Sequence, residues 1–246
     1  MLTINQVKEL SKTLKINDSV IIREYTQLVF LKELYGEKYS TTIFFKGGTA
    51  IRLILNGTRF SEDLDFSVGG KKEVFHSFIV KFFKKIAKLY GFSFKKRTTI
   101  AGERYLLTAD SSISQYKIFV NLDFSFREKV LKPARAIIIT PYPIIFTAFV
   151  NFLSEEEILA EKIRAVLTRS KGRDIYDLWF LLSNRVPVKD KKFNPDDLIA
   201  KINQFSREKF VVDLRPFVPI NERAKLPEFF DYVIAYLTEA VSSKTN

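Results

Sequence analysis

Two short groups of residues in the segment KGGTAIRLILNGTRFSEDLDF suit phosphate chemistry. Gly47 and Gly48 let the backbone turn sharply and let a ligand approach it closely. Asp63 and Asp65 alternate, so in a strand both side chains point to the same face. Two neighbouring carboxylates repel each other unless a cation lies between them. Hard oxygen ligands suit Mg²⁺, which binds one or two carboxylates together with substrate phosphates. The segment therefore predicts a metal site beside a phosphate-binding turn.

The elements around these residues predict how they are positioned. A strand over residues 42–45 ends at the glycines, and Thr49 then caps a short helix that stops at Gly57. The first-turn N–H groups and the positive end of that helix favour an anion such as a phosphate. The chain returns through Arg59 and Ser61 to the strand with the two carboxylates. Taken separately, a Gly-Gly-Thr triplet is usually a turn and an Asp-x-Asp motif a solvated strand end, but the combination is far more specific.

This combination resembles the nucleotidyltransferase superfamily related to DNA polymerase beta, whose signature is Gly-Gly or Gly-Ser, a short helix and then Asp-x-Asp. The wording FKGGTAIRL and RFSEDLDF is more similar still to the AbiEii-type toxins, the nucleotidyltransferase half of type IV toxin–antitoxin and abortive-infection systems. The resemblance covers most of the chain and is strong at residues 45–66 and 159–178. It implies an α+β fold, with a nucleotidyltransferase-type mixed β-sheet, flanking helices and a C-terminal helical domain.

A third carboxylate comes from the segment KIFVNLDFSF, which alternates as a strand with one apolar face. Asp123 lies on the other face, in a strongly apolar context where a lone charge is costly. A metal shared with Asp63 and Asp65 would give this carboxylate a partner. The superfamily places its third carboxylate here, whereas the alternative is an Asp exposed to water at a strand end or sheet edge.

Further candidates lie on two predicted helices, over residues 154–169 and 172–182. Lys162 falls on the apolar stripe of the first helix, where a charge is costly unless it is paired. Either its amine reaches water along the core surface, or it enters a cleft between domains and meets a phosphate. Asp174 and Asp177 lie near the start of the second helix, where they could simply cap it. LAEKIRAVLTR and RDIYDLW again resemble the AbiEii-type toxins, which implies Lys162 as their Lys and either Asp as their following acid.

The composition excludes several classes of protein. The 246 residues are 46% hydrophobic and include no Cys, so disulfide frameworks and thiolate metal sites are excluded. The single histidine, His76, excludes His-rich zinc sites and argues against a His-based catalytic triad. We find no signal peptide and no apolar run that could span a bilayer, so we expect a cytoplasmic protein without a membrane partner.

The net charge of +12, from 40 basic and 28 acidic residues, favours a polyanionic partner, with nucleic acid first. A Lys-rich, thermophilic proteome is the alternative, although Glu is not abundant here.

Proline residues between positions 132 and 143 place the expected domain boundary near residue 150. We expect a nucleotidyltransferase core domain over residues 1–150 and a helical domain over residues 151–246. The expected helices span residues 4–35, 72–90, 197–205 and 226–241, and the expected strands span residues 92–100, 104–109 and 136–140, with a turn at Ala101 and Gly102.

The resemblance implies phosphoryl transfer, in which positioning and charge neutralisation do most of the catalysis. Two Mg²⁺ ions, or Mn²⁺ as the alternative, would clamp the attacking and leaving oxygens. Asp123 would also help to activate the acceptor hydroxyl, and Lys162 would neutralise the leaving pyrophosphate. The catalytic candidates are Asp63, Asp65, Asp123 and Lys162, of which the three aspartates are the metal ligands, and the nucleotide-binding candidates are Lys46, Gly47, Gly48, Thr49, Arg59, Ser61, Asp174 and Asp177.

The expected partners are an NTP such as ATP or GTP, an RNA acceptor and a cognate antitoxin. By resemblance, the acceptor is the 3′ end of tRNA, and growth arrest is the outcome. A small molecule or a protein hydroxyl is a rival acceptor. A non-catalytic nucleotide- or RNA-binding protein is a rival of another class, against which the intact set of three aspartates argues.

Overall fold

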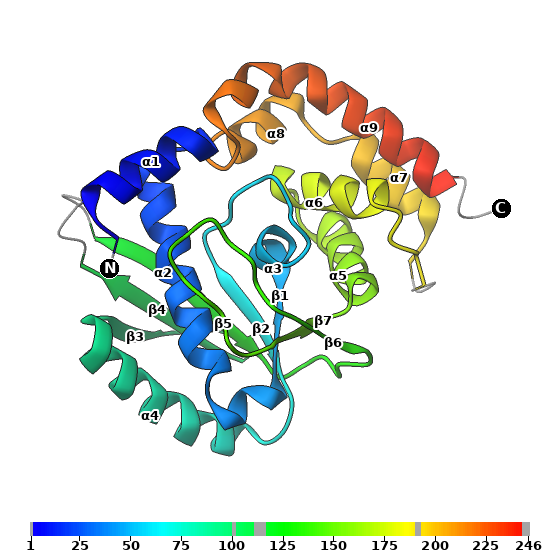
Figure 1. The fold of residues 1–246 in the computed structure, drawn as a ribbon. Coiled ribbons are helices and arrows are strands. Elements are labelled where there is room, and N and C mark those ends of the chain that lie inside the picture. Colours follow the sequence, from blue (N-terminus) through cyan, green and yellow to red (C-terminus); the bar gives the residue numbers. More distant parts are fainter. Residues whose placement is uncertain (1, 100–101, 111–116, 190–192, 243–246) are drawn as a thin grey trace. The chain divides into compact units, whose positions relative to one another are not determined.

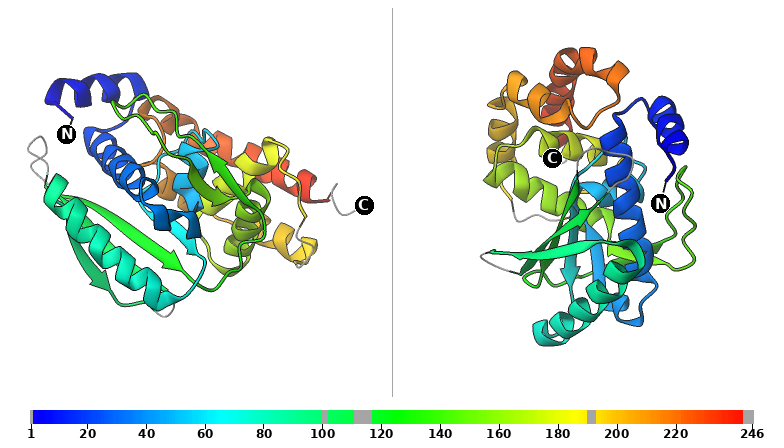
Figure 2. Two further views of the ribbon diagram at one scale, coloured as in Figure 1. Left: turned by 60° about the horizontal axis from the view of Figure 1, so that its bottom comes forward. Right: turned by 90° about the vertical axis from the view of Figure 1, so that its left-hand side faces the viewer.

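A computed structural model of the protein describes residues 2–99, 102–110, 117–189 and 193–242 (Figures 1 and 2). The chain divides into two compact units, Met1–Leu153 and Ser154–Asn246. We describe each unit by itself. Strand β7 (Val150–Leu153) belongs to the sheet of the first unit, so the division follows this strand.

The described residues of the first unit form a seven-stranded sheet in the order β3-β4-β5-β2-β1-β7-β6 (Figure 1). Pairs β2–β5 and β1–β7 are parallel and the others are antiparallel, so the mixed sheet predicted from the sequence is confirmed. The other strands are β1 (Ile43–Lys46), β2 (Leu64–Val68), β3 (Ser93–Arg97), β4 (Glu103–Ala109), β5 (Ile118–Ser125) and β6 (Pro133–Ala136). The helices of this unit are α1 (Ile4–Leu14), α2 (Asp18–Tyr35), η1 (Lys38–Thr42), α3 (Gly47–Leu53) and α4 (Lys72–Tyr90).

Helices α2 and α4 cover one face of the sheet through aromatic contacts. Phe30 of α2 lies 6.3 Å from Phe66 of β2, between ring centroids, and Phe75 of α4 lies 4.8 Å from Phe124 of β5. Along β4 and β5, every second side chain is buried on this face, while the side chains between them are exposed or half-buried. The alternation follows from the period of two in a strand. One face of the sheet is therefore core, and the other is available for polar chemistry.

Most predicted elements of this unit are present, and some bounds differ. The helix predicted over residues 72–90 is confirmed as α4. The helical region predicted over residues 4–35 is present as two helices, because Lys15 adopts a left-handed conformation (φ 52°) that ends α1 before α2 begins. The strand expected over residues 136–140 is wrong, since β6 ends at Ala136. Two positions of the expected strand end and turn, Ile100 and Ala101, lie outside the described residues.

The second unit is helical throughout its described residues. Its elements are α5 (Glu155–Thr168), α6 (Gly172–Ser183), α7 (Pro195–Asn203), α8 (Arg207–Leu214), η2 (Ile220–Lys225) and α9 (Leu226–Ser242). Ser154 caps α5 by accepting a hydrogen bond from the Glu157 backbone N–H. Trp179 and Phe229 pack edge to face between α6 and α9, with ring centroids 4.8 Å apart. No helix among the described residues is long and apolar enough to cross a membrane.

Candidate active site

A row of five charged residues crosses five neighbouring strands of the sheet. Arg97 is in register with Arg104, Arg104 with Asp123, Asp123 with Asp65, and Asp65 with Lys46. Residues in register on neighbouring strands share a face of the sheet. The two aspartates are therefore side by side at the centre of the row, with cationic residues at both ends. The sheet itself brings Asp65 and Asp123 together from positions 58 residues apart in the chain.

Asp63 lies one residue before β2 and is held on the same face of the sheet. Its carboxylate Oδ1 accepts a hydrogen bond of 2.8 Å from the Asn121 side chain, which lies two residues before Asp123 on β5. The Thr49 hydroxyl donates to the Asp63 backbone carbonyl, which joins α3 to this segment. The three aspartates singled out in the sequence are thus on one side of the sheet, at its centre.

One guanidinium is influenced by all three carboxylates. The Arg104 Nε lies 2.5 Å from Asp123 Oδ1, and this hydrogen bond is the main cause of a raised pKa at Arg104. The negative charges of Asp123, Asp63 and Asp65 raise the pKa of Arg104 further. A nearby anion favours the charged form of a base, which agrees with the placement of the three acids on one face of the sheet.

The donor set is of the type that binds a hard divalent cation, since three carboxylates lie on one face of the sheet, from β2, β5 and the segment before β2. Among the described residues, however, no group of three His, Cys, Asp or Glu side chains is already arranged to hold a metal ion. Arg104 instead places positive charge on Asp123. Its side chain is 47% exposed, so it can leave Asp123 without losing a packed environment. The residues fit such a cation once the guanidinium moves aside.

The two glycines are needed because charged side chains occupy the space beside them. Gly47 has a φ of +77°, and a Cβ atom there would lie 2.3 Å from Asp65 Oδ2. A Cβ atom on Gly48 would lie 2.4 Å from Arg59 Nη2 and 3.1 Å from Ser61 Oγ. A side chain at either position would displace the site residues. The structure thus brings Gly47 next to Asp65, and Gly48 next to Arg59 and Ser61.

Thr49 was expected to cap the short helix, and this expectation is wrong. Lys46 is the N-cap residue of α3, and Thr49 is buried in the first turn with its hydroxyl on the Asp63 carbonyl. The helix ends at Leu53, earlier than the predicted stop at Gly57. The glycines begin the helix here because the tight turn and the close approach of Asp65 both occur at Gly47.

Arg52 fixes the back of this helix to the rest of the unit. Its guanidinium lies 2.9 Å from the buried carboxylate of Glu24 on α2 and donates a 3.0 Å hydrogen bond to the Gly57 carbonyl. It also lies 4.1 Å above the Phe60 ring. These contacts hold both ends of the segment that carries Arg59 and Ser61.

Three residues near the acids were not identified from the sequence: Arg104, Asn121 and Glu128. Glu128 Oε2 lies 3.3 Å from Lys46 Nζ and accepts a 2.7 Å hydrogen bond from the Ser125 hydroxyl. Partial burial raises the pKa of Glu128, but the Ser125 hydrogen bond and the Lys46 charge outweigh it, and the pKa is lowered. The strand alternation already placed Asn121 on the face of Asp123, whereas Arg104 and Glu128 required knowledge of strand register and loop path.

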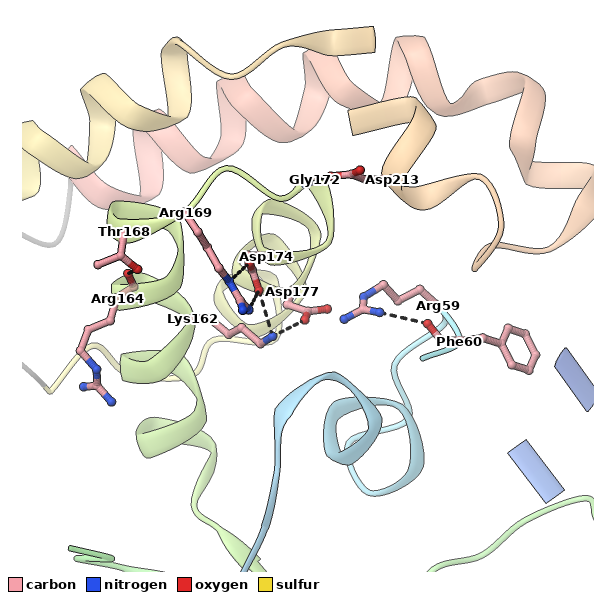
Figure 3. Close-up of polar contacts among 10 residues, drawn as sticks. All are labelled: Arg59, Phe60, Lys162, Arg164, Thr168, Arg169, Gly172, Asp174, Asp177 and Asp213. Carbon is pink, nitrogen blue, oxygen red and sulfur yellow. Dashed lines mark hydrogen bonds and ion pairs between the residues drawn. The ribbon is translucent and has the colours of Figure 1, made fainter. Parts of the chain in front are cut away.

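The second unit holds the remaining candidates in a buried ion cluster (Figure 3). Lys162 Nζ of α5 lies 2.7 Å from Asp177 Oδ2 and 3.2 Å from Asp174 Oδ1, both on α6. Arg169 contacts both oxygens of Asp174, at 2.8 and 2.9 Å. Burial raises the pKa of Asp174, but the Lys162 charge and the Arg169 hydrogen bond outweigh it, so the pKa is lowered.

This cluster decides between the two structural alternatives considered for these residues. Lys162 does not extend to water, because it is only 7% exposed and paired with both aspartates. Asp174 and Asp177 do not cap α6 either, since Lys171 is its N-cap residue and the backbone N–H of Gly172, at the first position of the helix, donates to Asp213 Oδ2 instead. Lys162 pairs with both aspartates, which explains why the sequence did not single out one of them as its partner.

The comparisons with known proteins agree with this architecture. The sequence model of the family described as "Nucleotidyl transferase AbiEii toxin, Type IV TA system" matches residues 29–234. The crystal structure of JHP933 from Helicobacter pylori is similar, with a TM-score of 0.55 and 21% sequence identity over 94% of this chain and 96% of that chain. A second H. pylori protein, which carries only a provisional name as a nucleotidyltransferase, gives a TM-score of 0.56 and 21% identity over 93% of this chain and 98% of that chain.

A comparison with curated proteins gave no match. At 21% identity, the two crystal structures establish a shared fold. The family match is broader evidence, because it spans most of the chain and includes the glycine turn, the three aspartates and Lys162. The protein therefore belongs to the AbiEii nucleotidyltransferase toxin family of type IV toxin–antitoxin systems.

Proposed function

We propose that this protein uses a divalent cation, Mg²⁺ or Mn²⁺, to transfer NMP from an NTP to the 3′-terminal hydroxyl of a tRNA. The observation that carries the proposal is the placement of three carboxylates on one face of the sheet, with Asp65 and Asp123 in register and Asp63 held beside them by Asn121. Membership of a toxin–antitoxin family adds growth arrest as the outcome and a cognate antitoxin as the partner that prevents it. Because NTPs and tRNA are cytoplasmic molecules, the proposed reaction would take place in the cytoplasm.

The acids and the glycine turn divide the work. A bound divalent cation would neutralise the triphosphate and the charge that develops on the leaving group. Asp65 and Asp123, which are in register on neighbouring strands, would hold that cation, and Asp63 would complete the set. Gly47 and Gly48 have no side chains, so Asp65, Arg59 and Ser61 can lie directly against the turn where the phosphates would bind.

The bond changes follow those of nucleotidyl transfer. The acceptor oxygen bonds to the α-phosphorus of the NTP, the bond to pyrophosphate breaks, and pyrophosphate leaves with the electron pair. Asp123 takes the proton of the acceptor hydroxyl. Lys46, Arg59 and Ser61 supply positive charge and hydrogen bonds at the turn, on the side where the triphosphate lies.

Lys162, Asp174 and Asp177 have two roles open to them in this proposal. The salt bridges within the second unit support a structural role, because all three side chains are buried and paired. A direct role of Lys162 on the pyrophosphate predicts a catalytic loss beyond the loss of stability. Variants at this position separate the two roles, as described below.

RNA is the favoured acceptor because the net charge is +12 and RNA is a polyanion. A small molecule or a protein hydroxyl is the rival, and binding that falls steeply with salt separates RNA from small acceptors.

The experiment incubates the protein with Mg²⁺, total tRNA and each labelled NTP in turn. We expect label in RNA with the parent protein and none with Asp65→Asn or Asp123→Asn. Asp110→Asn is the matched control, because it removes an exposed carboxylate at the end of β4, in the same sheet. Circular dichroism checks that each variant is folded. Equal labelling by the parent protein and Asp65→Asn would overturn the proposed site, and labelling of another acceptor in place of RNA would overturn the tRNA assignment.

A further inference from the structure

The face of the sheet opposite α2 and α4 remains accessible along strands β3, β4 and β5. Its side chains alternate with those of the core, and each is exposed or half-buried. We call this surface the open face, and it consists of Ser93, Lys95, Arg97, Arg104, Leu106, Thr108, Phe119 and Asn121.

The open face is cationic on β3 and β4, and its β3 cations, Lys95 and Arg97, lie two strands away from Asp123. Lys95, Arg97 and Arg104 lie on β3 and β4, and the open-face positions described on these two strands include no carboxylate. Two cross-strand rows lead from them toward the site. Arg97 and Arg104 continue to Asp123, and Lys95 continues through Leu106 to Asn121, whose side chain hydrogen-bonds to Asp63. A polyanion held by these cations has a continuous surface to the carboxylates.

An exposed aromatic ring lies beside these rows. Phe119 on β5 is 49% exposed and is in register with Thr108. It occupies the same face as Asn121 and Asp123, two and four residues farther along the strand. Phe119 thus shares the open face with the basic side chains of β3 and β4, and proteins that bind single-stranded nucleic acids use this combination, because bases stack on the ring while phosphates contact the cations.

The two ends of the charged row, at β1 and at β3, differ in their surroundings. Lys46 and the glycine turn lie at the β1 end, in the middle of the sheet, whereas Arg97 lies on β3, which is an edge strand. At the β1 end, Asp65 lies against Gly47, and Arg59 and Ser61 lie against Gly48, so the candidate phosphate-binding residues gather there. The β3 end is open at the sheet edge, so a long chain can extend beyond it. The two substrates can therefore approach the acids from opposite directions.

We propose that the open face binds the single-stranded 3′-terminal nucleotides of the RNA acceptor, with the strand entering over β3 and its hydroxyl end at Asp123. This inference rests on the proposed function and adds the surface and the direction of approach. An acidic protein segment could also contact Lys95 and Arg97, but it would have no use for Phe119 as a stacking platform. The favoured occupant is therefore RNA.

The test measures binding of a short fluorescent single-stranded RNA to the full chain by anisotropy, over a series of salt concentrations. We expect Lys95→Ala/Arg97→Ala to weaken binding about 10-fold or more near 100 mM salt. Loss of two phosphate contacts lowers the slope of log affinity against log salt by about 1.4. The matched control is Lys84→Ala/Lys88→Ala, which removes the same charge from exposed positions of α4.

Phe119 is tested separately from charge. We expect Phe119→Leu to weaken binding about 10-fold, and Phe119→Trp to retain it, because stacking needs a ring. Thermal unfolding shows whether either variant is destabilised. Leu removes the ring but keeps an apolar side chain of similar reach, so a loss of binding with unchanged stability supports stacking.

Two outcomes overturn the inference. One is unchanged RNA binding by Lys95→Ala/Arg97→Ala, or an equal loss in the α4 control. The other is binding of an acidic protein at this face that depends on Lys95 and Arg97 while RNA binding does not. The proposed function is separable from both, because Asp65→Asn should bind RNA normally and fail to transfer NMP. If Lys95→Ala/Arg97→Ala binds RNA and transfers NMP as the parent protein does, the inference about the open face is wrong and the proposed function stands.

Discussion

The protein pairs aspartates with cationic side chains in both of its units, but the two clusters differ in their access to solvent. In the first unit, Asp123 and Arg104 have side chains that are 27% and 47% exposed. In the second unit, Asp174 and Asp177 are buried, and Lys162 is nearly so. An exposed ion pair is weak and exchanges readily, whereas a buried pair cannot lose one member without leaving an uncompensated charge. The first cluster is therefore suited to exchanging partners, and the second to holding helices together.

The largest expected effect is on activity at the exposed cluster. Asp65→Asn should lower nucleotidyl transfer by about 10³-fold or more, because electrostatic groups at the transition state have effects of this size. Its stability should be unchanged or slightly higher, since one of three neighbouring negative charges is removed. Transfer assays and urea unfolding measure the two quantities. If Asp65→Asn is strongly destabilised as well as inactive, the proposed difference between the two clusters is wrong.

The converse effect is expected at the buried cluster. Lys162→Met leaves two buried aspartates without their lysine and should lower the free energy of unfolding by about 3–5 kcal/mol, measured in urea. Lys189→Met, which breaks an exposed ion pair with Glu156 in the same unit, is the control and should cost less than about 1 kcal/mol. If Lys162→Met is nearly as stable as the parent but inactive, Lys162 acts on the substrate.

The glycine turn sharpens the comparison because it tests how tightly the exposed cluster is built. Gly47→Ala should reduce transfer by about 100-fold, since a Cβ atom would displace Asp65 and small misplacements have effects of this order. Gly70→Ala is the control: Gly70 also has a positive φ, of +95°, but no heavy atom lies within 4 Å of the added Cβ. Both variants bear backbone strain, so equal losses of activity would mean that strain alone is responsible.

A smaller effect is expected on cation binding. Arg104→Gln removes the guanidinium from Asp123 and should strengthen Mn²⁺ binding roughly 10-fold, since a hydrogen bond to a charged group contributes about 1.5–3 kcal/mol. Electron paramagnetic resonance of free Mn²⁺ measures this without any substrate. Arg104→Lys keeps the charge and should change the affinity less. Weaker Mn²⁺ binding by Arg104→Gln would contradict the idea that Arg104 and the cation compete.

The smallest effect concerns the pH dependence of stability. The pKa of Asp174 is lowered in the folded protein, so its ionised form stabilises the fold. This contribution is fully present above the pKa of the unfolded chain and is lost as the pH falls through the folded value. The stability difference between the parent and Asp174→Asn should therefore shrink below about pH 4. Asp231→Asn, which removes an exposed carboxylate paired with Arg207, should show no such trend.

Local patterns predicted much of the fold and some of the site. The apolar stripe of α4 fixed both ends of that helix, and the alternation around Asp123 placed it on the polar face of β5. Such features depend on residues within one element, whose periods of 3.6 and 2 are visible in the sequence. The mixed sheet followed from the resemblance carried by the glycine turn and Asp63-x-Asp65.

The missed features depend on contacts between elements. Arg104 reaches Asp123 only because β4 and β5 pair in one register, and Glu128 reaches Lys46 because of the path of the loop after β5. The role expected for Thr49 failed for the same reason, since its hydroxyl satisfies a carbonyl that is 14 residues away. The partners of Lys162 come from another helix, which the position of Lys162 on an apolar stripe could not identify.

The three aspartates of the first unit differ in how firmly the fold positions them. Asp65 and Asp123 are in register on paired strands, so the backbone hydrogen bonds fix the spacing between the two strands at roughly 4.8 Å. Asp63 precedes β2, so strand pairing does not fix its backbone. Its carboxylate is held by the hydrogen bond from the Asn121 amide, and its position is therefore less constrained. In the proposed cation site, Asp65→Glu or Asp123→Glu would therefore disturb a fixed spacing, whereas Asp63 would adjust to ions of different radius.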